Sequence, residues 1–242
     1  MNIFKLERER EREKQWLLNA VNEGDGLELL RSLKNEVAQL VIFDPQYKDT
    51  KNTAKHVNEH YYKLPHANQD EQNIKDFVKE IARVLKPSAF LLFWIDDLIL
   101  IKSNFKQWIS EPLKVIEILI WKKGKFVGLG INYFRKNCEY ALLIQKEPLK
   151  KQVKDAGIVN VFSEIVDFAK RHNTHEKPYK MTKKIIKQLT NTEDLVVDPC
   201  AGSFVVMEAC LATNRNFLGV DLTFNELQER EREQNLFLLM TK

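Results

Sequence analysis

The fold is decided by residues 195–203, which read LVVDPCAGS, and by a similar stretch at residues 40–47, which reads LVIFDPQY. In each stretch a short apolar run ends in an Asp-Pro turn. An apolar strand that runs into an acidic turn and then into a helix is how an open α/β sheet builds a ligand site at its carboxyl edge. The two stretches therefore predict two ligand-contacting strand ends in one sheet.

The rest of the chain alternates between strand and helix patterns. Strands are predicted at residues 37–43, 90–95, 115–121, 139–145, 195–197 and 217–220, and helices at 4–22, 74–85, 98–108, 181–189 and 205–211. This alternation predicts an α/β fold with a mostly parallel central sheet, helices on both faces and a late β-hairpin. No internal repeat or low-complexity linker divides the chain, so we expect a single domain over residues 1–242.

The composition is that of a globular protein. Hydrophobic residues make up 44% and charged residues 30% of the chain, and the net charge of +4 permits nucleic-acid binding without demonstrating it. Cys138, Cys200 and Cys210 form no CxxC pair, so neither a disulfide framework nor a zinc ribbon is indicated. The charged N-terminus is unlike a secretory signal and no segment has the length of a membrane span, so we expect a cytoplasmic protein with no membrane partner.

The turn at residues 198–203 has the chemistry of a nucleotide-like cofactor site. Gly202 allows a ligand to approach the backbone, and N–H groups at the start of the following helix favour a carboxylate or phosphate. About 20 residues later Asp221 ends the next strand, a position suited to holding ribose hydroxyls. Taken alone, the turn could equally be a tight connection between a strand and a helix.

The turn at residues 44–47 suits a heteroaromatic base that carries an amino group. The Asp44 carboxylate and the Pro45 carbonyl are two neighbouring hydrogen-bond acceptors, and Tyr47 adds an aromatic ring. The acceptors can take the two N–H bonds of an exocyclic amine while the ring stacks on the base. The alternative is a structural turn in which Asp44 caps backbone N–H groups and Pro45 fixes φ.

Together these stretches resemble the beta-class DNA amino-methyltransferases, the permuted family that methylates adenine N6 or cytosine N4. The matching segments follow the family's order over residues 24–222: an acidic turn and helix at 24–30, the (D/N/S)PP(Y/F/W) motif at 41–47, a helix end and strand at 84–94, hairpin strands at 120–123 and 138–143, the Glu-Lys-Pro at 176–178, and the turn at 198–203. Gln46 stands where the family usually has a second proline, and Phe204 where it usually has a second glycine. The resemblance implies a Rossmann-like, S-adenosylmethionine-dependent methyltransferase fold.

The resemblance also implies roles for individual residues. Asp44 and the Pro45 carbonyl would accept both hydrogens of the target amine, whose lone pair then points at the sulfonium methyl of S-adenosylmethionine. The base would leave the DNA duplex, and Tyr47 would stack on it. The implied catalytic residues are Asp44, Pro45, Gln46 and Tyr47. The implied cofactor residues are Asp25 at the adenine, Asp221 at the ribose, Asp198, Gly202, Lys177 and Pro178 at the methionine end, and Asp44, Pro199, Cys200 and Ser203; no metal is expected.

By the same resemblance the chain divides into a catalytic half at residues 24–146, a short target-recognition segment at 147–176, a cofactor-binding half at 177–222 and a C-terminal helix at 223–242. The implied function is site-specific methylation of adenine N6 in duplex DNA with an extruded target base, as in restriction–modification systems, since Asp at the first catalytic position favours adenine. Cytosine-N4 or RNA methylation, or an inactive nucleic-acid-binding subunit, are the alternatives. A homodimer or a partner subunit is left open.

Two further segments carry weaker signals. Residues 56–60 have the His-x-x-Glu-His spacing of a zinc peptidase but lack an evident third ligand. They lie in a polar stretch, 48–72, that is long enough to be a functional lid, so a DNA-contacting loop or plain surface is the better interpretation. The basic and aromatic loop at 122–136 suits phosphate contacts or, alternatively, a solvated hairpin end.

Overall fold

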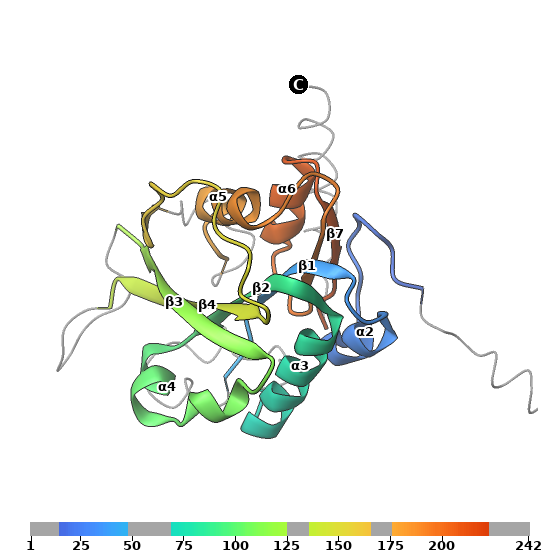
Figure 1. The fold of residues 1–242 in the computed structure, drawn as a ribbon, viewed down its shortest axis with the longest axis horizontal. Helices are drawn as coiled ribbons and strands as arrows, with labels where there is room; N and C mark the ends of the chain where they lie inside the picture. The colour runs from blue at the N-terminus through green and yellow to red at the C-terminus, as the bar shows by residue number, and fades with distance from the viewer. Residues whose placement is uncertain (1–14, 48–68, 125–135, 166–175, 223–242) are drawn as a thin grey trace, which may run out of the picture.

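A computed structural model describes residues 15–47, 69–124, 136–165 and 176–222. The strands of these residues form one sheet in the order β5-β3-β4-β2-β1-β6-β7 (Figure 1). They are β1 (Ala38–Phe43), β2 (Leu85–Ile95), β3 (Leu113–Lys122), β4 (Cys138–Lys146), β5 (Val161–Ser163), β6 (Leu195–Asp198) and β7 (Asn216–Gly219). β1 is parallel to β2 and β6, and β6 to β7, whereas β4 is antiparallel to β2 and β3. The predicted mostly parallel sheet with a late hairpin is confirmed.

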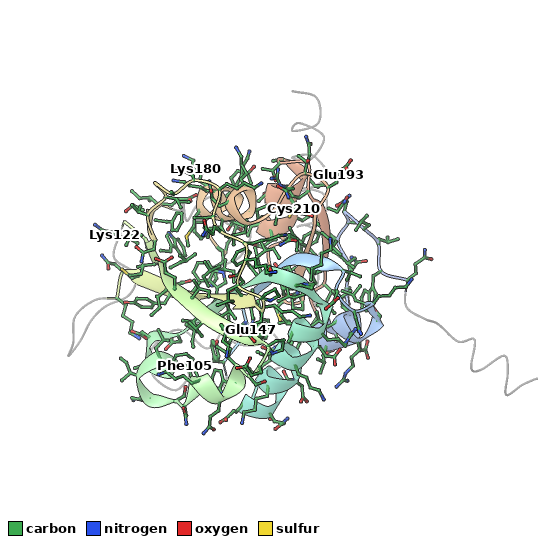
Figure 2. The ribbon with its side chains drawn as sticks, viewed as in Figure 1. Phe105, Lys122, Glu147, Lys180, Glu193 and Cys210 are labelled. Carbon is green, nitrogen blue, oxygen red and sulfur yellow. The ribbon has the colours of Figure 1, made fainter. Side chains whose placement is uncertain are left out.

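Helices cover both faces of this sheet. Leu40 and Ile42 of β1 pack with α5 (Tyr179–Leu189) and α6 (Val205–Leu211), whereas Val41 and Phe43 pack with α2 (Gly26–Ser32) and α3 (Glu71–Val84). The central strands are therefore buried on both faces, which is why they read as continuous apolar runs. Figure 1 shows α5 and α6 on one side of the sheet and α2 and α3 on the other, and side chains fill the layers between them (Figure 2).

The helix α3 illustrates how local sequence specifies an element. The Asp70 side chain accepts the backbone N–H of Asn73 and caps the helix N-terminus. Ile74, Phe77 and other apolar residues at helical spacing form one buried face, and the ring of Phe77 stacks on Phe43 with centroids 5.0 Å apart. Burial of this face fixes the helix against β1, next to the turn that follows that strand.

The predicted helix at residues 4–22 is wrong where the structure describes it, since residues 15–22 are not helical. Asn19 has a left-handed φ of 59°, and its side chain accepts the backbone N–H of Phe217. The Asn22 amide donates to the carbonyls of Leu17 and Gly219. These side-chain bonds tie the segment to β7 in place of helical bonds.

The predicted helix at residues 98–108 is two short pieces, α4 (Asp97–Lys102) and the 3₁₀ helix η3 (Phe105–Trp108). The Ser103 backbone N–H and hydroxyl both donate to the Ile99 carbonyl, which ends α4. The short edge strand β5 had no prediction; it pairs in parallel with residues 120–122 of β3.

Several predictions fall outside the described residues. These are the His-x-x-Glu-His motif at 56–60, most of the loop at 122–136, the C-terminal helix at 223–242 and the first part of the N-terminal helix. The division of the chain into halves stays a prediction. Among the described residues, no helix has the length and apolarity needed to cross a membrane.

The contact between α2 and the turn after β6 yields a stability prediction. An added Cβ at Gly26 would lie 2.0 Å from the Pro199 carbonyl oxygen. Gly26→Ala should therefore lower the free energy of unfolding by about 1–3 kcal/mol, because backbone must shift. Urea denaturation measures this. Gly157→Ala is the matched control, because among the described residues its Cβ would meet only the flexible Asp155 carboxylate, at 3.2 Å. Equal effects at both positions would contradict this explanation.

Candidate active site

The parallel strands bring the two predicted turns to one edge of the sheet. Asp44 follows β1, Asp198 is the last residue of β6, and Asp221 lies just beyond β7. Burial raises the pKa of Asp198 well above its ordinary value, and the nearby carboxylates of Asp44 and Asp221 raise it further. Residues from the two ends of the chain thus share one electrostatic environment.

Lys177 links the two halves of this edge. Its Nζ lies 2.8 Å from Asp44 Oδ2 and 3.1 Å from Glu139 Oε2, and 4.7 Å from the ring centroid of Trp94. Burial opposes the charge of this ammonium, but Asp44 and Glu139 outweigh burial and raise the pKa of Lys177. Lys177 is therefore a permanent cation that is paired with the central acceptor of the predicted catalytic turn.

Glu139 belongs to the same network. Burial would raise its pKa, yet the ammonium groups of Lys177 and Lys123 hold the pKa of Glu139 down to about 2. Its other carboxylate oxygen pairs with Lys123, which lies next to the end of β3. The hairpin thus contributes an ionised carboxylate to the site.

Tyr47 has a different environment from the one expected of a stacking platform. The residue is only 9% exposed, its ring stacks on Trp108 with centroids 6.2 Å apart, and its hydroxyl donates to the Trp94 carbonyl at 2.9 Å. Burial raises the pKa of the Tyr47 phenol well above its ordinary value, so the hydroxyl stays a donor. In this structure Tyr47 anchors the turn to β2, and the ring belongs to the core.

The predicted adenine and ribose residues are brought together by backbone pairing. The Gly24 N–H donates to the Asp221 carbonyl at 2.8 Å, and the Asp221 N–H donates to the Asn22 carbonyl at 3.2 Å. This pairing places Asp25 beside the strand end that carries Asp221. The Asp25 carboxylate accepts the N–H groups of Leu27 and Glu28, so it also caps α2.

Two aspartates, one in the turn at 198–203 and one beyond β7, accept backbone N–H groups of this turn. Asp198 accepts the N–H of Cys200, and Asp221 Oδ2 accepts the N–H of Gly202 at 2.8 Å. Gly202 has a φ of +48°, and among the described residues, its chain neighbours aside, no atom lies within 4 Å of the position of a Cβ there. Conformation rather than crowding therefore requires glycine, and the open space leaves room for a ligand.

The remaining members of the predicted set frame the site. Pro45 and Ser203 are buried and Gln46 is exposed. Pro178 is the residue before the first turn of α5. Burial raises the pKa of the Cys200 thiol well above its ordinary value, so this cysteine stays a neutral thiol rather than a nucleophile. Among the described residues, no group of three side chains is placed to hold a metal ion.

The structure gives a reason for phenylalanine at position 204, where the family usually has a glycine. Phe204 has left-handed backbone angles, φ 56° and ψ 23°, at the N-cap of α6, where glycine is unstrained. Its ring is fully buried and packs edge-on against Phe217 with centroids 6.1 Å apart. The chain accepts backbone strain here and gains a buried aromatic side chain.

Sequence reasoning missed Glu139, Lys123, Trp94 and Gln69 as site residues. Gln69 donates its N–H to the Gln46 carbonyl at 2.9 Å and its amide to Cys200 Sγ at 3.5 Å. Its buried Oε1 has no hydrogen-bond partner among the described residues. Glu139 carried a detectable signal, because a carboxylate beside the apolar run of the late hairpin must face either solvent or a cation.

The arrangement suits a cationic ligand and a ligand that donates hydrogen bonds, because carboxylates carry negative charge and accept hydrogen bonds. Asp44, Asp198 and Asp221 lie close together at one sheet edge, and Lys177 joins Asp44 to Glu139 of the hairpin. Fold and site together define an α/β protein with a ligand site at the carboxyl ends of its parallel strands. A family model described as DNA methylase, of the N6/N4 type, matches residues 38–229, and the chain belongs to this family.

Individual relatives agree with this assignment. The chain is 33% identical over 226 residues to the Type II methyltransferase M.HhaII of Haemophilus parahaemolyticus, covering 89% of this chain and 96% of that protein. The crystal structure of the M1.HpyAVI–SAM complex has a TM-score of 0.62 at 18% identity, covering 89% of this chain and 98% of that one. The cytosine-N4-specific PvuII DNA methyltransferase has a TM-score of 0.65 at 15% identity, covering 84% and 82%. The predicted beta-class amino-methyltransferase family and fold are confirmed.

The backbone strain at Phe204 predicts the order of stability of the parent and of its glycine and alanine variants. Phe204→Ala keeps the left-handed strain and loses the ring, which should cost about 3–5 kcal/mol. Phe204→Gly loses the same ring but relieves strain, so it should be about 1 kcal/mol more stable than the alanine variant. Urea denaturation should therefore rank the proteins as Phe, Gly, Ala in falling stability. An alanine variant as stable as the glycine variant would contradict the strain, and a glycine variant as stable as the parent would contradict the packing.

The buried charge of Asp198 generates a pH-dependent prediction. A carboxyl group whose pKa is raised by folding lowers the stability of the protein at pH values above its unfolded-state pKa, and this cost shrinks as the pH falls. Asp198→Asn keeps an oxygen for the Cys200 N–H and should melt at a higher temperature than the parent at pH 8. The difference should narrow towards pH 5 in thermal unfolding. Asp155→Asn, at an exposed aspartate, is the control and should not raise the melting temperature. A difference in melting temperature between Asp198→Asn and the parent that does not change with pH would contradict this explanation.

Proposed function

We propose that this DNA amino-methyltransferase transfers the methyl group of S-adenosylmethionine to N6 of adenine in duplex DNA. The observation that carries the proposal is the meeting of Asp44 with Asp198 and Asp221 at one sheet edge, with Lys177 paired to Asp44. An amine-accepting turn and a cofactor turn that share an edge can align a nucleophile with a methyl donor.

The cofactor side of the site fits S-adenosylmethionine. When bound, this cofactor supplies an electrophilic methyl group on a cationic sulfonium. Asp221 would hold the ribose hydroxyls, Asp25 the adenine, and the 198–203 turn the methionine end. The space over Gly202 and the buried Asp198 support this placement, since a cationic ligand would stabilise the ionised form that burial disfavours.

On the catalytic side, Asp44 and the Pro45 carbonyl would accept the two hydrogens of the exocyclic amine. The amine lone pair is delocalised into the ring of the base, so both bonds favour a more pyramidal nitrogen. These bonds strengthen as positive charge develops on the amine, which lowers the barrier rather than only binding the base. Pairing with Lys177 favours the ionised form of Asp44, the form that accepts.

Adenine is favoured over cytosine by the aspartate at position 44, according to the family resemblance. Cytosine N4 is the second candidate, because the chain shares its fold with a cytosine-N4-specific enzyme. In both cases the target base must leave the duplex to reach Asp44. We propose that Tyr47 forms a rigid side of the base-binding site, since its ring is packed on Trp108.

Methyl transfer to DNA tests the proposal. The chain should transfer tritium from labelled S-adenosylmethionine to unmethylated phage DNA, and nucleoside mass spectrometry should identify N6-methyladenine. Asp44→Ala should lower kcat by about 10²–10³-fold, because it removes an acceptor for the developing charge. Cofactor binding, measured by calorimetry, should be largely kept.

Two results would sink the proposal: no methylated base in the product, or equal rates for the parent and Asp44→Ala. N4-methylcytosine in place of N6-methyladenine would establish the second candidate. Asp194→Asn, at the opposite end of β6 from Asp198, is the control and should retain the parent rate.

A further inference from the structure

The sheet edge that carries Asp44 and Asp198 is called the catalytic edge below. Four charged side chains form a continuous line there, in the order Lys123, Glu139, Lys177, Asp44. Each contact joins different segments: residues at the two strands of the hairpin, the entry to α5, and the end of β1. Signs alternate along the line, so each inner member has an oppositely charged neighbour on both sides. Methyl transfer by Asp44 and the Pro45 carbonyl gives Glu139 no direct role.

The burial of Lys177 makes its second partner important. Its side chain is only 15% exposed, and it divides its N–H bonds between Asp44 at 2.8 Å and Glu139 at 3.1 Å. A buried ammonium that loses a carboxylate partner is strongly destabilised, because little water reaches it. The Trp94 ring beneath it adds attraction but offers no lone pair of the strength of a carboxylate.

The target amine needs the same carboxylate that Lys177 holds. Two donors therefore compete for Asp44 when a base enters the site. Lys177 can weaken its bond to Asp44 at low cost only if another carboxylate keeps the ammonium paired. Glu139 is that carboxylate among the described residues.

We infer that Glu139 is a positioning residue for methyl transfer: it shares the Lys177 ammonium with Asp44 and thereby lets the target amine engage Asp44. This inference rests on the proposed function. Glu139 does not touch the reacting atoms and acts through Lys177. Lys123 holds Glu139 in place from the other side, and both ammonium groups keep it ionised throughout the physiological pH range.

The test is the charge-deleting variant Glu139→Gln, assayed with tritiated S-adenosylmethionine at saturation and unmethylated phage DNA. Without Glu139, Lys177 depends on Asp44 alone, so base entry becomes harder. We expect kcat/KM for DNA to fall by about tenfold, a typical coupling between neighbouring charged groups. The calorimetric Kd for S-adenosylmethionine should change by less than about twofold, because the change lies on the base side.

Glu80→Gln is the matched control. Glu80 is also a largely buried glutamate in an ion pair, 2.7 Å from Arg83, but it lies on α3 away from the catalytic edge. It should retain the parent kcat/KM for DNA, so loss of a glutamate ion pair by itself does not explain a change at Glu139.

Dependence on Lys177 separates positioning from a purely structural role. In a Lys177→Gln background, adding Glu139→Gln should change single-turnover rates at saturating S-adenosylmethionine by less than about twofold, since no ammonium is left to share. Enzyme in excess keeps slow variants measurable. The same tenfold loss in both backgrounds would overturn the inference, as would parent-like kinetics of Glu139→Gln.

If Glu139→Gln alone does not fold, the comparison within the Lys177→Gln background decides the question by the same criterion. Absence of methyl transfer by the unaltered chain is a different result. It would contradict the proposed function, and the inference would fall with it.

Discussion

The parallel pairing of β1 with β6 is the constraint on which the site depends. Leu40 pairs with Val196 and Val41 with Val197, so both strands run out at the same edge and in the same direction. Asp44 and Asp198 are brought together by this register, although 153 residues separate them in the chain. A shift of one residue would turn the side chains of β1 to the opposite faces, and both helical layers would lose their apolar partners.

Charge is distributed across this edge so that stability and ligand binding oppose each other. Asp198 is buried close to two other carboxylates, which disfavours its ionised form. Lys177 compensates in part, because it is buried at the same place and held protonated by Asp44 and Glu139. An edge with excess buried carboxylate is a poor design for stability alone, but it suits a cationic methyl donor and an amine-bearing base.

The central fold was predictable because its strands are buried on both faces and end in distinctive turns. The apolar runs before Asp44 and Asp198 gave strong local signals, and the order of motifs between them indicated the family.

Predictions failed where long-range contacts override local pattern. Residues 15–22 have helix-like apolar spacing, but hydrogen bonds from Asn19 and Asn22 tie them to β7. The packing of Tyr47 on Trp108 is likewise not evident from local pattern, whereas its stacking on a target base stays a prediction. Glu139 escaped notice because its partners come from other segments that an antiparallel strand brings to the same edge.

The central claim is that the two turns are halves of one methyl-transfer site, with the cofactor turn presenting its ligand to Asp44. A crystal structure of the chain with S-adenosylmethionine tests this most directly. The account predicts that the ribose contacts Asp221, that the methionine end lies on the 198–203 turn, and that the sulfonium methyl points towards Asp44. A cofactor bound at another edge, or one whose methyl points away from Asp44, would contradict it.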